Sequence, residues 1–114
     1  MDKQRRKELI GEYKTRQPEM GVVSYVCTMT GEMFLSAAKD TKADVNSTLT
    51  KLESGFHPNK RLLELWKEYG RDGFVISTLE TLEYEDGVED YTQDLEVLRD
   101  ELLVQNPGAK KVWR

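Results

Sequence analysis

The chain has 114 residues, and 17 Lys and Arg against 21 Asp and Glu give it a net charge of −4 at pH 7. This length predicts one domain over 1–114 with a modest core. A hydrophobic fraction of 38% excludes a wholly unfolded chain, and the single Cys27 excludes an intrachain disulfide framework. No apolar run approaches the roughly 20 residues of a membrane span. No secretory signal is recognisable, so we expect a cytoplasmic protein without a membrane partner.

Charge is unevenly distributed along the sequence. Residues 1–16 carry six basic and three acidic side chains, whereas residues 80–101 carry ten acidic side chains and one base, Arg99. The first segment has a net charge of +3 and the second a net charge of −9. A basic segment can contact phosphate or an acidic partner, and an acidic segment repels nucleic acid. Two solvated helix faces would give the same pattern, so charge alone does not identify a function.

The first elements along the chain are predicted to be a helix and a hairpin. Residues 2–14 have an amphipathic pattern, and the helix ends before Pro18 because the residue preceding a proline avoids helical conformation. Residues 21–28 are rich in β-branched and aromatic side chains, which predicts a strand. Residues 33–35 return as its partner after a tight turn at Gly31, so the two segments form a hairpin.

Three helices and a strand follow in the sequence. Apolar residues at steps of three and four predict helices over 42–54 and 60–69. Residues 74–79 are predicted to form the third strand. The acidic segment 88–104 is predicted to form the last helix. A short basic tail, 110–114, then ends the chain. The apolar stripe of the last helix consists of Val88, Tyr91, Leu95, Leu98 and Leu102.

The predicted element order is therefore α-β-β-α-α-β-α. It indicates an α/β (α+β) domain with a small three-stranded sheet of antiparallel type, flanked by helices. The last helix can pack on the sheet through its apolar stripe, or on a second copy of the chain to form a homodimer. A third hypothesis is that it covers the functional cleft as an acidic mimic of nucleic acid.

Local motifs alone do not identify an enzyme. His57, the only imidazole, lies between two predicted helices, where a structural role is more common than general-base catalysis. Cys27 lies in a strand among apolar neighbours, as a buried and inert thiol would. The carboxylates from Glu80 onward lack the spacing of a calcium loop, and no glycine-rich phosphate-binding motif is present.

A set of short motifs follows in a fixed order between residues 21 and 82. In chain order they are Gly21-Val22-Val23, Thr30-Gly31-Glu32, Phe34-Leu35-Ser36, Gly55-Phe56-His57-Pro58-Asn59, Leu62-Leu63, Leu65-Trp66, Tyr69-Gly70, Phe74 and Leu79-Glu80. With these motifs the segment 21–82 resembles the GIY-YIG nuclease domain, and in particular its small bacterial members. The resemblance makes 21–82 the core of the domain, with the helices 2–14 and 88–104 outside it.

The resemblance implies hydrolysis of a phosphodiester bond with one metal ion, by two tyrosines, an arginine and a metal-binding glutamate. Here Val23 and Phe34 stand at the tyrosine positions, Asp44 stands at the arginine position, and only Glu80 matches. Valine and phenylalanine cannot transfer a proton, and an aspartate places a negative charge where the transition state needs a cation. We therefore expect an inactive relative that binds nucleic acid or protein and needs no cofactor.

Two alternatives remain open at the level of sequence. An active endonuclease would need Mg²⁺ or Mn²⁺ at Glu80, with Tyr25 and His57 as substitutes for the lost groups. A purely structural protein would dimerise through the stripe of the last helix. If the partner is DNA, the predicted phosphate contacts are Lys39, Lys42, Lys60 and Arg61.

Overall fold

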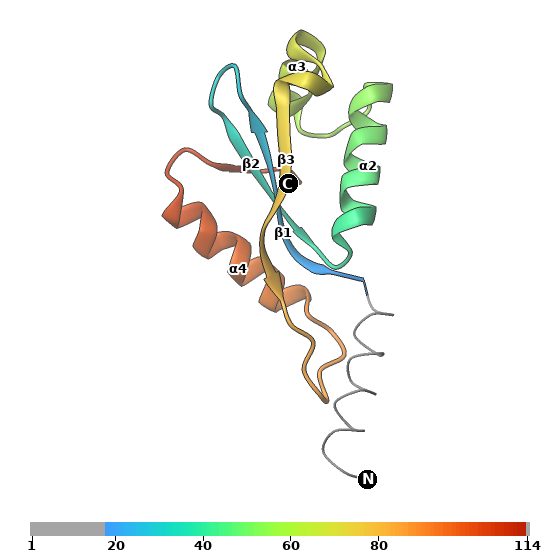
Figure 1. Ribbon diagram of the computed structural model, residues 1–114, viewed down its shortest axis with the longest axis vertical. Helices are drawn as coiled ribbons and strands as arrows, with labels where there is room; N and C mark the ends of the chain where they lie inside the picture. Colours follow the sequence, from blue (N-terminus) through green and yellow to red (C-terminus); the bar gives the residue numbers. More distant parts are fainter. Residues whose placement is uncertain (1–17, 114) are drawn as a thin grey trace.

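The computed structural model describes residues 18–113, so the predicted helix 2–14 lies outside the described residues. The described chain forms a four-stranded sheet in the order β3-β1-β2-β4 (Figure 1). The central strand β1 (Met20–Cys27) pairs antiparallel with β2 (Met33–Ala38) on one side and with β3 (Phe74–Leu82) on the other. The hairpin and the third strand are thus confirmed.

The predicted three-stranded antiparallel sheet is incomplete, because the basic tail adds a fourth strand. β4 (Lys110–Lys111) pairs parallel with β2, which makes the sheet mixed. The N–H of Val112 then donates to the carbonyl of Leu35 at 2.9 Å, and the Val112 side chain is fully buried. A two-residue strand is too short to show an alternating pattern in the sequence.

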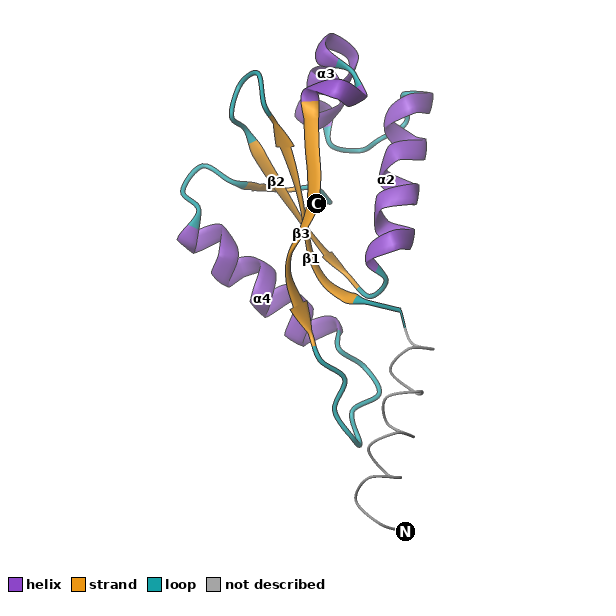
Figure 2. Ribbon diagram, in the orientation of Figure 1, coloured by secondary structure: helices purple, strands orange, loops and turns teal. Residues whose placement is uncertain are grey.

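Helices cover both faces of this sheet (Figure 2). One face carries α2 (Thr41–Ser54) and α3 (Lys60–Tyr69), and the short 3₁₀ helix η1 (Arg71–Gly73) leads from α3 into β3. The opposite face carries α4 (Thr92–Gln105), which contacts β1 and β2. The acidic helix therefore lies on the face of the sheet opposite to α2 and α3.

The apolar stripe of the last helix is used inside the chain. Tyr91, Leu95 and Leu102 are buried against the sheet, and Leu98 packs beside them. Only Val88 is substantially exposed, because α4 begins at Thr92 and leaves Val88 in the preceding loop. The surface predicted to form a homodimer is therefore mostly part of the core.

A β-bulge in β3 changes which side chains face each layer. Val23 pairs with Thr78 but Val22 pairs with Glu80, so Leu79 is an extra residue in β3. Gly21 allows the close approach of the two strands here: a Cβ at this position would overlap the carbonyl oxygen of Glu80. The bulge reverses the alternation of β3, because an extra residue shifts every later side chain to the other face.

No helix among residues 18–113 is long and apolar enough to cross a membrane.

Candidate functional site

A half-buried carboxylate, Asp44 of α2, lies at the centre of a polar cluster on the face of the sheet that α2 covers. Its Oδ2 accepts a hydrogen bond from the Tyr25 hydroxyl of β1 at 2.7 Å. Its Oδ1 accepts one from the Ser36 hydroxyl of β2 at 2.8 Å and one from the Trp113 indole N–H at 3.2 Å. Two neighbouring strands and the C-terminal segment thus donate to one carboxylate.

Tyr25 is held in its neutral form. Its side chain is 1% exposed, and this burial is the main reason why the pKa of the phenol is raised far above its usual range. The nearby Thr48 hydroxyl opposes this shift by lowering the pKa, while the negative charge of Asp44 and its hydrogen bond to Tyr25 raise it. Tyr25 therefore serves as a hydrogen-bond donor to Asp44 at neutral pH and not as a base.

His57 lies beside this cluster, and it is almost fully buried. Its Nδ1 accepts a hydrogen bond from the backbone N–H of Asn59 at 3.0 Å, and its ring stacks on Trp113 with 4.5 Å between centroids. Burial lowers the pKa of His57, and the positive charge of Lys51 lowers it further, while Asp44 opposes them. The ring is therefore neutral near pH 7 and packs as part of the structure.

The C-terminal residues complete the cluster, and sequence analysis missed their role. Trp113 contacts both His57 and Lys51: its ring stacks on the imidazole, and the Nζ of Lys51 is 4.8 Å from the centroid of the indole ring. The side-chain amide of Asn59 holds the backbone in place by donating to the carbonyls of Lys111, at 2.9 Å, and Val112, at 3.2 Å. No local pattern in a basic tail of five residues predicts such contacts.

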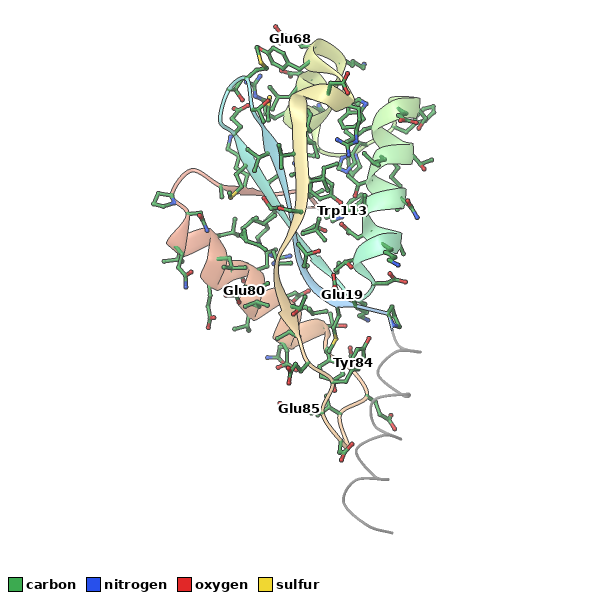
Figure 3. All side chains as sticks on the ribbon, in the orientation of Figure 1. Glu19, Glu68, Glu80, Tyr84, Glu85 and Trp113 are labelled. Atoms are coloured by element: carbon green, nitrogen blue, oxygen red, sulfur yellow. The ribbon has the colours of Figure 1, made fainter. Side chains whose placement is uncertain are left out.

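Figure 3 shows Trp113 and Glu80 in different parts of the molecule, and the family positions do not meet in one site. Val23 and Phe34 are 1% exposed and belong to the core on the α2 face, next to Asp44. Glu80 pairs with Val22, whose side chain packs toward α4, so the exposed Glu80 faces the other side of the sheet. The structure therefore brings Tyr25 and His57 to the surroundings of Asp44, and Glu80 lies apart from them.

The described residues do not fit the metal ion that the resemblance implies. Among residues 18–113, no group of three or more His, Cys, Asp or Glu side chains could hold a metal. Glu80 has no set of neighbouring ligands there, and Asp44 uses its oxygens to accept hydrogen bonds from three protein donors. A hard divalent cation needs several oxygen ligands around one point.

The four predicted phosphate contacts do not form one patch. Lys39 and Lys42 lie at the start of α2, whereas Lys60 and Arg61 follow its other end, and a 14-residue helix is about 20 Å long. Lys39 pairs with Asp90 at 3.7 Å. Arg61 pairs with Glu32 at 3.0 Å and with Glu64 at 3.3 Å. Two of the four cations are thus already next to carboxylates.

A wide groove of about 970 Å³ lies between α2 and β3. Its apolar lining comes from Pro18, Val23, Val45 and Ile76. Glu19 joins its two walls, because its Oε1 accepts hydrogen bonds from the hydroxyls of Thr41, at 3.0 Å, and Thr78, at 3.3 Å. Lys42, Asp40 and Arg71 also line the groove, so its charge is mixed.

This arrangement of sheet and helices is a GIY-YIG-like α+β fold, and two solved structures share it. One is the catalytic domain of the homing endonuclease I-TevI, with a TM-score of 0.67 and 17% identity over 83% of this chain and 99% of that chain. The other is a mutant of the catalytic domain of the intron endonuclease I-TevI, with a TM-score of 0.60 and 23% identity over 76% of this chain and 81% of that chain. The fold that the sequence predicted is thus confirmed.

No family model matches the chain, and no curated protein sequence matches it significantly.

Proposed function

We propose that this chain is a catalytically inactive protein with a GIY-YIG nuclease fold that acts as a binding module. The observation that carries the proposal is the position of Asp44, whose carboxylate accepts hydrogen bonds from Tyr25, Ser36 and Trp113. The resemblance places an arginine at this position. An anion that three side chains hold in place is a structural group, and by the resemblance it stands where a phosphate would need a cation.

The chemistry of phosphodiester hydrolysis supports this proposal. Negative charge develops on the phosphate oxygens in the transition state, and enzymes stabilise it with cations or hydrogen-bond donors. A carboxylate at the same place would repel this charge. Val23 and Phe34 have no polar side-chain atom, so neither can take a proton from an attacking water.

The two substitutes considered for the lost groups are engaged elsewhere. The Tyr25 hydroxyl donates to Asp44, and its raised pKa keeps it protonated at neutral pH. His57 uses Nδ1 as an acceptor for a backbone N–H and is covered by Trp113. A general base needs a free lone pair within reach of the water it activates. These contacts favour an inactive module over an active endonuclease.

A cleavage assay tests the inactive state. Plasmid, single-stranded and branched DNA are incubated with the full chain and Mg²⁺ or Mn²⁺, and we expect no product. The matched variants are Glu80→Ala and Glu83→Ala, two exposed carboxylates whose replacement leaves the core intact. Cleavage that disappears in Glu80→Ala but persists in Glu83→Ala would overturn the proposal.

The charge of the described residues favours a protein partner over nucleic acid. Residues 18–113 carry 10 Lys and Arg against 18 Asp and Glu, a net charge of −8. Affinity for a phosphate backbone comes mainly from cations. The groove between α2 and β3 has an apolar lining, and β3 is the last strand on its side of the described sheet. An extended peptide can add to such an edge by backbone hydrogen bonds.

Nucleic acid remains the second candidate partner, because residues 1–16 have a net charge of +3. Fluorescent duplex and single-stranded DNA are titrated with the full chain at low and moderate salt. For a protein-binding module we expect no salt-dependent binding. Binding that is lost in Lys42→Glu, a groove residue, but kept in Lys67→Glu on α3 would place nucleic acid in the groove instead.

A further inference from the structure

A second groove lies on the other side of the sheet, between the end of β3 and α4. It has a volume of about 420 Å³, and its lining combines an apolar strip with carboxylates. The strip consists of Leu82, Val97 and Leu98, and Val97 is 50% exposed. No basic side chain of the described residues lines this groove. The carboxylates that line it are Glu83, Glu85, Asp94 and Glu101.

The wall that α4 provides has the spacing of a helix-binding surface. Asp94, Val97, Leu98 and Glu101 follow one another at steps of three, one and three residues, so they lie on one face of the helix. Two apolar side chains are thus flanked by an acid on either side. An amphipathic helix with basic flanks would match both the apolar strip and its charge.

We propose that the basic N-terminal segment of the same chain, residues 1–16, docks in this acidic groove. The segment has a net charge of +3, opposite to that of the groove, and its sequence predicts an amphipathic helix over 2–14. Leu9, Ile10 and Tyr13 would supply the apolar contacts. The cations that would flank them are Lys3, Arg5, Arg6, Lys7 and Lys14.

The point of attachment supports docking within one chain. The carbonyl of Pro18, the first described residue, accepts a hydrogen bond from the Tyr84 hydroxyl at 2.6 Å. The ring of Tyr84 packs edge-on against Tyr91, with 5.5 Å between centroids, and Tyr91 lines the groove. Pro18 itself lines the groove between α2 and β3, so the segment leaves the described chain near both grooves, and only the second of them is lined by carboxylates without a basic side chain of the described residues. A 13-residue helix is about 20 Å long, comparable with α4.

Engineered disulfide formation tests this proposal in the full chain with Cys27→Ala. The test pair is Tyr13→Cys with Val97→Cys, and the control pair is Tyr13→Cys with Met29→Cys, which lies in the distant β1–β2 turn and is 67% exposed. We expect the test pair to close within one chain at least about tenfold faster than the control, because docking raises the local concentration of the two thiols.

The charge requirement is tested with the same disulfide. Formation of the test disulfide should slow toward the rate of the control pair in about 1 M salt, where charges more than about 3 Å apart are screened. It should also slow when Asp94 and Glu101 are both replaced by lysine. Control replacement of Glu64 and Glu68 on α3 by lysine should leave the rate unchanged, since α3 lies on the other face of the sheet.

Each remaining outcome contradicts the proposal. Equal rates for the two pairs would mean that the segment has no preference for the groove. Disulfides between two chains, growing with protein concentration, would assign the groove to the segment of a second copy. The test does not depend on the proposed function, because docking of residues 1–16 is possible in an active or an inactive protein.

Discussion

Asp44 and its neighbours differ from the GIY-YIG pattern in a mutually consistent way. The resemblance places an arginine at position 44, and here an aspartate stands there and accepts a hydrogen bond from Ser36. Tyr25 is a second donor from the adjacent strand. Hydrogen bonds to an ionised acceptor are stronger than those between neutral groups. The cluster therefore stabilises the contact between α2 and the sheet. An aspartate at position 44 without these donors would not stabilise it.

Replacing Asp44 by alanine should destabilise the chain by about 2 to 3 kcal/mol, because the buried hydroxyls of Tyr25 and Ser36 lose their acceptor. The free energy of unfolding from urea titration measures this loss. Glu53→Ala on the same helix is the control, since Glu53 is exposed, and it should change stability by at most about 0.5 kcal/mol. Equal effects of both variants would contradict a structural role for Asp44.

Tyr25 should make the folded chain sensitive to alkaline pH. Below the ordinary tyrosine pKa of about 10, Tyr25 is protonated in both the folded and the unfolded chain, so its raised pKa does not change the free energy of unfolding there. Above that pH the unfolded chain releases a proton that the folded chain retains, and the free energy of unfolding falls as pH rises. In Tyr25→Phe this alkaline decrease in the free energy of unfolding should become smaller, whereas the control variant Tyr69→Phe should retain it. Urea titration at several pH values measures the decrease. The same decrease in Tyr25→Phe and in the wild type would contradict the role of Tyr25.

At the scale of elements, the C-terminal segment joins the sheet to the polar cluster. β4 pairs with β2, and Trp113 then covers His57 and donates to Asp44. Sequence patterns predicted most helices and strands of 18–113, because their apolar periodicities extend over several residues. β4 has only two residues, and it forms because the edge of β2 offers backbone partners. Its role could not be predicted locally.

Trp113→Ala should raise the pKa of His57 toward its ordinary value, because removing the indole opens the ring to water. NMR titration of the single histidine measures this shift. Trp113→Phe keeps an aromatic ring on His57 and should retain the low pKa. A His57 pKa that is the same in wild type and Trp113→Ala would show that Trp113 does not shield it.

The same pKa shift has a consequence for stability in acid. Since the pKa of His57 is lowered on folding, the unfolded chain binds a proton more readily below about pH 6.5. The stabilising contribution is therefore complete above that pH and lost as the pH falls through the folded-state value. In Trp113→Ala this loss should be smaller, and urea titration at several pH values measures it.

At the scale of the whole molecule, one sheet is shared by two layers of helices. β1 contributes Val23 and Tyr25 to the α2 and α3 face, and Val22 to the α4 face. Because both helix layers pack on β1, one layer cannot separate from the sheet without disturbing the strand on which the other layer packs. The predicted single domain would therefore unfold in one cooperative step.

Two probes should report the same unfolding transition. Trp66 and Trp113 both pack on the α2 and α3 face, so their fluorescence follows that layer. Far-UV circular dichroism follows all helices, including α4. Urea midpoints from the two methods should coincide. A separate transition seen only by circular dichroism would mean that α4 detaches before the rest.

The sequence by itself determined the α+β class, the hairpin, the third strand, the described helices and the family resemblance, because these depend on residue types at short spacings. The tertiary structure decided the fourth strand and the use of the α4 stripe in the core. It also decided the positions of the site residues. The bulge at Leu79 turns Glu80 away from Asp44, and Trp113 reaches Asp44 across 69 positions of sequence. Such relations depend on strand register and chain return, which no local pattern contains.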